Sequence, residues 1–194
     1  MTYLIAGAVV FFGLHLFSAL RPRTPGRDLR VRMGEGPYMG LYSLVAIAGF
    51  FLMLWGYGAA RPAEVVFTAP VWGRHLNYVL MIPAFILLAA AYAPAGWIKR
   101  WTGHPMVLAV AIWAGGHLLA NGDLASLILF GAFLAYSLVS RVAAGARGDL
   151  GAARAAPTVR GDLIAVGVGS AAYALTLVWL HPILSGVAVW PVVA

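Results

Sequence analysis

The stretch Tyr3–Leu20 reads YLIAGAVVFFGLHLFSAL and contains no Asp, Glu, Lys or Arg. A bilayer core of about 30 Å requires roughly 17 to 25 helical residues, so this stretch is long enough to cross it. Backbone polar groups cannot stay unpaired in lipid, and the residues do not alternate as barrel strands would. The stretch therefore predicts a membrane-spanning α-helix.

Five further apolar runs follow, so we predict an all-α, polytopic membrane helix bundle that forms one domain over residues 1–194. The six predicted transmembrane helices are Tyr3–Leu20, Met39–Ala60, Leu76–Ala93, Pro105–Ala120, Leu124–Ser140 and Leu163–Leu180. The segment Arg141–Asp162 is rich in Ala, Gly and Arg, which favours a mobile linker. The tail from His181 is too short to span, and we expect it to fold back with Trp190 at the interface.

The composition supports the same class of protein. Hydrophobic residues make up 62% of the chain and charged residues 10%, so lipid must be the solvent for most of it. The absence of cysteine excludes disulfides, thiolate metal sites and covalent haem attachment through Cys-x-x-Cys-His. The net charge of +7 comes from short loops between apolar runs, which indicates a membrane protein with no nucleic-acid partner.

The loop charges predict the orientation. On one side of the predicted bundle lie the loop between the second and third spans and the loop after the fourth. These loops contain only two basic residues, Arg61 and Arg74. The positive-inside rule therefore places the basic loops in the cytoplasm and both termini outside. The eleven basic residues on the predicted cytoplasmic side are Arg21, Arg23, Arg27, Arg30, Arg32, Lys99, Arg100, Arg141, Arg147, Arg154 and Arg160.

Two histidines lie inside predicted spans. His15 and His117 each come twelve residues after the start of a span, about 18 Å along the helix. Because the two spans run in opposite directions, both rings fall near mid-membrane, at heights that differ by roughly 6 Å. Imidazole is neutral when it binds a metal, so the pair could hold the two faces of a haem iron. Ionisable side chains at this depth usually have a function.

Each of these histidines stands in a Gly-x-His-Leu element. Gly13, Gly115 and Gly116 could leave flat space for a porphyrin edge, or could instead allow close helix packing with the histidines only hydrogen-bonded. A proton path or another metal is a further reading. One copy of the element opens each three-span half, as in an inverted repeat, although the register does not extend beyond it.

The remaining polar candidates lie near span ends. His75, beside Arg74 at the outer end of the third span, is an alternative ligand or proton carrier. Arg74 is also a candidate for the haem propionates if these point outward, and Arg21 if they point inward. His104 precedes Pro105 at the start of the fourth span, and His181 is expected to be structural. Asp123 is expected to be the N-cap of the fifth helix.

Several motifs resemble those of the NnrU family of bacterial membrane proteins over nearly the whole chain. They are His15-Leu16-Phe17-Ser18, Arg21-Pro22, Arg32-Met33-Gly34-Glu35, Gly40-Leu41-Tyr42-Ser43-Leu44, Trp55-Gly56-Tyr57, His104-Pro105, His117-Leu118-Leu119-Ala120-Asn121-Gly122-Asp123 and His181-Pro182. The resemblance implies a multi-pass protein of the bacterial inner membrane, associated with nitrite and nitric oxide reduction and with reductase components as possible partners.

The family is also similar to the plant 15-cis-zeta-carotene isomerase, which holds haem b. That similarity implies haem b here, with His15 and His117 as axial ligands and His75 near a third important histidine. It also implies a possible activity, the cis–trans isomerisation of a carotenoid-like polyene. The isomerase has a cysteine one turn before its second ligand, where this chain has Ala114, so thiolate ligation is impossible here.

Two other functions are compatible with the sequence. His104-Pro105 followed by Trp113 resembles the signature of isoprenylcysteine carboxyl methyltransferases, which use S-adenosylmethionine. Gly103 replaces the arginine of that signature, and no acidic residue completes the site in the following helix. The other function is that of a scaffold for a reductase, in which the histidines only pack.

Overall fold

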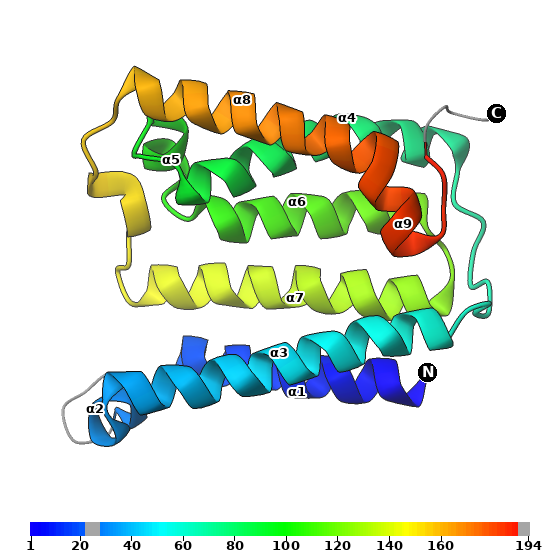
Figure 1. Cartoon of the computed structure of the whole chain (residues 1–194), viewed down its shortest axis with the longest axis horizontal. Helices are drawn as coiled ribbons and strands as arrows, with labels where there is room; N and C mark the ends of the chain where they lie inside the picture. The colour runs from blue at the N-terminus through cyan, green and yellow to red at the C-terminus, as the bar shows by residue number, and fades with distance from the viewer. Residues whose placement is uncertain (22–27, 190–194) are drawn as a thin grey trace. The chain divides into compact units, whose positions relative to one another are not determined.

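The computed structural model describes residues 1–21 and 28–189, and the regular elements of this part are helices (Figure 1). Arg23, Arg27 and Trp190 lie outside the described residues. The all-α prediction is confirmed. The helices are α1 Thr2–Leu20, α2 Leu29–Met33, α3 Glu35–Ala59, α4 Val71–Tyr92, α5 Trp97–Thr102, α6 Pro105–Ala120, α7 Leu124–Ala146, the 3₁₀ turn η1 Gly151–Arg154, α8 Val159–Leu175, the π-helix η2 Thr176–Leu180 and α9 His181–Ser185.

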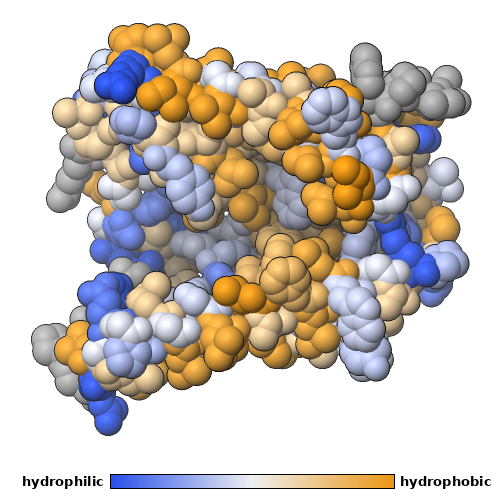
Figure 2. Space-filling model, in the orientation of Figure 1, coloured by the Kyte–Doolittle hydropathy of each residue, from blue (hydrophilic) through white to orange (hydrophobic). Residues whose placement is uncertain are grey.

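Five of these helical segments are long and apolar enough to cross a membrane: α1, α3, α4, α7 and the continuous segment Val159–Ser185. The helix α6 has the predicted bounds of the fourth span but is shorter than the others. Large apolar side chains such as Leu44 and Val79 are 66% and 61% exposed, which suits contact with lipid. Figure 2 shows hydrophobic residues over the sides of the helices and hydrophilic ones toward their ends. The chain is a helical membrane protein.

Several predicted boundaries are wrong. The helix α4 begins at Val71, so Arg74 and His75 lie inside its first turns and not ahead of it. The last helix does not stop at Leu180, because the π-helix η2 joins α8 to α9 without a break. In the predicted linker, residues 141–146 and 159–162 are helical, because α7 runs on and Thr158 caps α8 early.

The chain forms two compact units, each built from two separate segments. Unit 1 contains Met1–Thr68 and Gly122–Arg147, and unit 2 contains Ala69–Asn121 and Gly148–Ala194. The first, second and fifth predicted spans thus belong to unit 1 and the others to unit 2. The compact units are not the successive three-span halves that an inverted repeat would form. The single domain stays a prediction, since each unit is described by itself.

In unit 1, α1 packs against both α3 and α7. A Cβ added to Gly7 would collide with the backbone of Met53, and one added to Gly56 would collide with the backbone of Leu4. Leu4 and Met53 are themselves fully buried at this contact. Because residues early in α1 meet residues late in α3, the two helices are antiparallel and lie almost backbone to backbone, as small residues permit in membranes.

In unit 2, α4 packs against both α6 and α8. A Cβ on Gly169 of α8 would lie 2.6 Å from Ile86 Cα, and one on Gly161 would lie 2.6 Å from the carbonyl oxygen of Pro94. Gly73 of α4 lies in the same way against Leu119 of α6. Both neighbours run antiparallel to α4, so α4 is the central helix of this unit.

Carboxylates cap the helices at several ends. Asp123 Oδ1 accepts a hydrogen bond from Ser126 N (3.0 Å), which confirms the N-cap predicted for the fifth span. Asp162 of α8 accepts from the N–H groups of both Trp97 and Ile98 (2.9 Å each), and so it caps α5 from another helix. These bonds satisfy amide groups that have no partner within their own helix.

Basic residues gather at one end of each unit. In unit 1, Arg147 at the end of α7 donates to the carbonyl of Ala19 at the end of α1 (2.6 Å), whereas Arg61 lies at the opposite end beside Asp123 (3.8 Å). In unit 2, α5 carries Lys99 and Arg100 near the start of α8, and Arg74 lies in the opening turns of α4. Within each unit, the basic residues named here are thus unevenly divided between the two ends.

Candidate functional site

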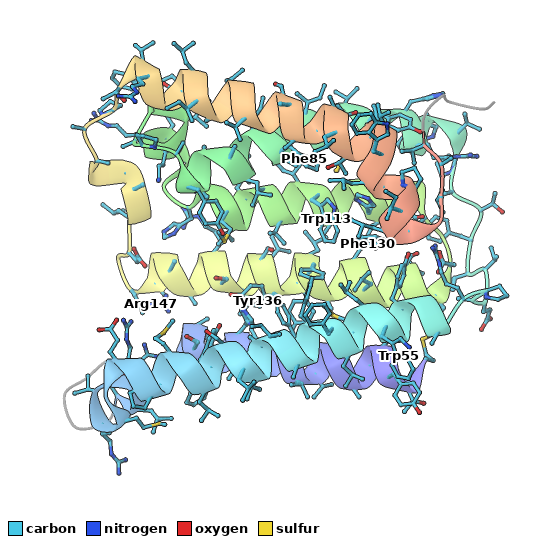
Figure 3. The ribbon with its side chains drawn as sticks, in the orientation of Figure 1. Trp55, Phe85, Trp113, Phe130, Tyr136 and Arg147 are labelled. Atoms are coloured by element: carbon cyan, nitrogen blue, oxygen red, sulfur yellow. The ribbon has the colours of Figure 1, made fainter. Side chains whose placement is uncertain are left out.

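The first histidine of interest, His15, lies on α1 among aromatic rings. Its Nδ1–H donates to the carbonyl of Phe11, one turn earlier, at 2.7 Å. The Phe11 ring centroid lies 4.1 Å from the imidazole, and those of Tyr42 and Tyr136 lie 5.4 and 5.6 Å away. All of these neighbours belong to unit 1, and Figure 3 labels Tyr136 on α7. The ring is half-buried in an aromatic setting.

The second, His117, lies on α6 with a matching local arrangement. Its Nδ1–H donates to the carbonyl of Trp113, again one turn earlier, at 2.8 Å. The Trp113 ring centroid lies 5.1 Å from the imidazole. The two histidines therefore have the same anchor in the same position, an aromatic residue four residues earlier that provides both the carbonyl and a ring contact.

This anchor determines which ring nitrogen carries the proton. A bond to a carbonyl oxygen requires hydrogen on Nδ1, so the neutral imidazole has its lone pair on Nε2. Histidines that bind metals usually have their other ring nitrogen bonded to a carbonyl or carboxylate in this way. In both residues, Nε2 is thus the ring nitrogen that does not bond to this carbonyl.

The glycines beside these histidines divide into two groups. A Cβ on Gly13 or Gly115 would meet no atom within 4 Å among the described residues. Gly116, in contrast, leaves the space that the carboxamide of Asn77 occupies. The expectation of free space next to each histidine therefore fits Gly13 and Gly115, while Gly116 serves the packing of α6 against α4.

A cavity of about 80 Å³ in unit 2 adjoins His117. Residues of α4, α6, α8, η2 and α9 line it, together with the segment after α9. The residues used below are Asn77, Tyr78, Phe85, Trp113, His117 and His181. The structure therefore brings His117 together with a second histidine, His181, that the sequence suggested was only structural.

The local structure explains how His181 reaches this cavity. The π-helix η2 widens the helix just before it, and such insertions often occur at functional sites. His181 Nδ1–H donates to the carbonyl of Val187 (2.9 Å), because the chain turns back after Gly186, which has a φ of +71°. Tyr78 of α4 then holds the turned chain through the carbonyl of Val189 (3.1 Å).

Asn77, one of the lining residues, has a polar atom without a hydrogen-bond partner among the described residues. Asn77 Oδ1 is buried and accepts no hydrogen bond from any described residue. Such an atom costs about 1–3 kcal/mol unless a ligand or water satisfies it. The chain has only two asparagines and no glutamine, and one of them, Asn77, lies inside a predicted span. A carboxamide at that depth is the sequence signal that could have indicated Asn77 as a candidate site residue.

The other predicted site residues lie elsewhere. Arg74 and His75 are exposed on the first turns of α4, in the same unit as His117. Arg21 is buried in an ion pair with Asp28 and is thus already neutralised. His15 belongs to unit 1, so the structure describes it separately from these residues.

Two further positions have structural explanations. His104 Nε2 bonds to the backbone oxygen of Asp149 (3.0 Å), which ties the start of α6 to the turn before η1. Ala114, where the isomerase has a cysteine, is fully buried in unit 2.

Long apolar helices, with two carbonyl-anchored imidazoles inside them, define a helical membrane protein with candidate metal-ligating histidines. The particular family follows from comparison with known families: the NnrU protein family matches residues 3–189, and the chain belongs to it. The resemblance seen in the motifs is therefore confirmed. No curated protein and no solved structure matches the chain.

Proposed function

We propose that this NnrU protein is a haem b-binding protein of the bacterial inner membrane that supports nitrite and nitric oxide reduction. His15 and His117 would hold its iron through their imidazoles. The observation that carries this proposal is the shared anchor of the two rings, in which Nδ1–H donates to the carbonyl four residues earlier. One such ring alone would only satisfy a buried polar group, whereas two matched rings on two spans suit bis-imidazole ligation.

Features beside each ring support the proposal. Gly13 and Gly115 each leave free space two residues before a ligand, and aromatic rings contact both imidazoles. The carbonyls of Phe11 and Trp113 would keep the ligand tautomer. Haem bound there would supply one-electron redox chemistry.

We further propose that all six apolar helices cross the membrane, with both termini outside. The support is the clustering of basic residues at one end of each unit. The helix α6 is the shortest, and its sixteen residues reach about 24 Å, which a locally thinned bilayer or buried neighbours can accommodate. Arg74, at the outer end, would then be the basic residue nearest to outward-pointing propionates.

The test is the absorption spectrum of protein purified from cells grown with ample iron, first oxidised and then reduced with dithionite. Bis-histidine haem b gives a low-spin spectrum with a Soret band. We expect His15→Ala and His117→Ala each to lose haem or to give a high-spin spectrum, and added imidazole to restore the low-spin form. His104→Ala, whose imidazole already bonds to Asp149, is the matched control. Full haem content with an unchanged spectrum in both ligand variants would overturn the proposal.

A second candidate function is haem-dependent cis–trans isomerisation of a carotenoid-like polyene. The observation that favours it is an apolar groove along α4 and α8, lined by residues such as Leu88 and Val168, that a lipid-soluble substrate could enter. The missing thiol at Ala114 requires that any such activity use imidazole ligands alone. Purified protein with reduced haem and a cis-polyene in detergent, followed by chromatography, would detect it. No observation favours the methyltransferase.

A further inference from the structure

An apolar groove of about 540 Å³ runs between α4 and α8 of unit 2. Phe85 of α4, labelled in Figure 3, lines it together with Leu88 and Val168, and both of these are exposed, so the groove is open to lipid. None of its lining residues is Asp, Glu, Lys or Arg. On α8 the lining extends from Ile164 to Ala172, about 12 Å along the helix, against roughly 15 Å for the depth of one leaflet. The groove therefore has the length and the chemistry to hold one acyl chain.

The end of this groove near the start of α8 has a free positive charge. Arg160, Ile164, Val168 and Ala172 are four residues apart, so Arg160 lies on the face of α8 that lines the groove. Because helical side chains lean toward the start of their helix, Arg160 extends past the end of the groove. Its side chain is exposed and forms no ion pair with a described carboxylate.

A second cation lies at the same end, on the side of α4. Lys99 Nζ donates to the carbonyls of Ala91 (3.0 Å) and Ala93 (2.8 Å), and Ala93 lines the groove. These carbonyls orient the ammonium group without neutralising it, and they use two of its three N–H donors. Lys99 and Arg160 thus bring two positive charges to the end of an apolar groove.

The acidic residues of unit 2 do not offset these charges by ion pairing. The unit has two carboxylates, Asp149 and Asp162. Both accept hydrogen bonds from backbone N–H groups, and neither forms an ion pair with Lys99 or Arg160. An anion at the end of the groove would therefore meet two cations that have no acidic partner among the described residues.

The short helix α5 indicates that this end lies at the membrane surface. It contacts both α4 and α8, and Figure 1 draws it beside the start of α8. Trp97 and Trp101 of α5 are exposed, as is Tyr92 at the end of α4. Tryptophan and tyrosine collect where hydrocarbon meets the lipid head groups. The groove therefore extends from the level of the head groups into the hydrocarbon.

We propose that this groove and its two cations bind an anionic phospholipid. One acyl chain lies in the groove against Leu88 and Val168, and the phosphate lies between Arg160 and Lys99. Basic pockets between membrane helices bind anionic head groups, and each cation near the membrane surface strengthens the attraction about fivefold. A hydrocarbon such as a polyene would leave both cations unused. The proposal requires that unit 2 lies in a membrane, and it is independent of whether His117 ligates iron.

The experiment measures lipid binding to the full chain in detergent by native mass spectrometry. The protein is titrated with phosphatidylglycerol or phosphatidylcholine of identical acyl chains, and with glycerol 3-phosphate, which has the phosphate without the chains. Squalene, a hydrocarbon without a head group, is the competitor. We expect the first phosphatidylglycerol to bind at least tenfold more tightly than the first phosphatidylcholine. Glycerol 3-phosphate should not bind, and an equal amount of squalene should not displace the phosphatidylglycerol.

Variants test the head site and the groove separately. Arg160→Gln should weaken binding of the first phosphatidylglycerol about fivefold, whereas Arg141→Gln, the same change at an exposed position of α7 in unit 1, should leave it unchanged. Val168→Trp fills the groove and should weaken binding more than tenfold, whereas Val166→Trp, at an exposed position of α8 outside the groove, should leave it unchanged. Helical circular dichroism checks that each variant has folded.

Four results would each overturn the proposal. Equal affinity for phosphatidylglycerol and phosphatidylcholine, or equal affinities of Arg160→Gln and Arg141→Gln, would remove the head site. Equal affinities of Val168→Trp and Val166→Trp would show that the acyl chain lies elsewhere. Tight binding of glycerol 3-phosphate would indicate a site for free phosphate, and displacement by squalene would indicate a hydrocarbon site. Because lipid is measured by mass and haem by absorption, failure of this proposal is distinguishable from failure of the haem proposal.

Discussion

Replacement of Gly56 by alanine should separate α1 from α3 and so destabilise unit 1. A Cβ at Gly56 would lie 2.7 Å from Leu4 Cα, whereas ordinary contacts of this kind begin at 3.4 Å. The obstacle is backbone, which cannot rotate away as a side chain can. The helices must therefore part by up to about 1 Å, a gap that costs a quarter to a half of the dispersion energy of each contact.

The expected loss of unfolding free energy is about 2–3 kcal/mol, the upper part of the range for overpacked sites. For a chain of this size, that corresponds to a fall in Tm of roughly 5–10 °C. The control is Gly58→Ala, two residues further along α3, where a Cβ meets nothing within 4 Å. It should be neutral or stabilising by up to about 1 kcal/mol, since alanine favours helix over glycine.

The assay follows helical circular dichroism of both variants in detergent micelles, by heating and by titration with a denaturing detergent. If Gly56→Ala melts at the same temperature as Gly58→Ala and the wild type, the close approach of α1 to α3 is not as described, and the reasoning from glycine contacts fails.

Two further predictions concern a cap and the orientation. Asp162→Ala removes the acceptor for the N–H groups of Trp97 and Ile98, so the unfolding free energy should fall by about 1–2 kcal/mol. Asp162→Asn keeps one side-chain oxygen and should recover part of this loss. Equal melting temperatures of the two variants would contradict the cap. Alkaline phosphatase, active only outside the cytoplasm, should be active when fused after Ala194, and green fluorescent protein should fluoresce when inserted at Gly148. The reverse pattern would invert the proposed orientation.

Helix boundaries were predictable from the sequence wherever they depend only on residues of that helix. The bounds of α6 and the start of α7 agree with the predictions, because Pro105 suits a first turn and Asp123 caps its own helix. The starts of α3 and α4 lie four or five residues ahead of their apolar runs, because a first turn can contain residues such as Glu35 or Arg74 that interrupt an apolar run.

The candidate site was predictable only in part. His15 and His117 follow from depth alone, because an imidazole inside an apolar run is conspicuous. Asn77 and His181 do not, since the cavity that they share depends on the π-helix η2 and on the turn after Gly186. Neither feature has a hydropathy signal.

The sequence by itself determined that the chain is a helical membrane protein with two mid-span imidazoles, because hydropathy and helix length act on each segment separately. Only the tertiary structure decided which helices pair. Chain order suggests halves of three successive spans, yet α7 joins α1 and α3, while α8 joins α4 and α6. The physical reason is that helix pairing depends on which glycines face a neighbouring backbone. Gly56 and Gly58 are both glycines of α3, and of these two only Gly56 faces Leu4.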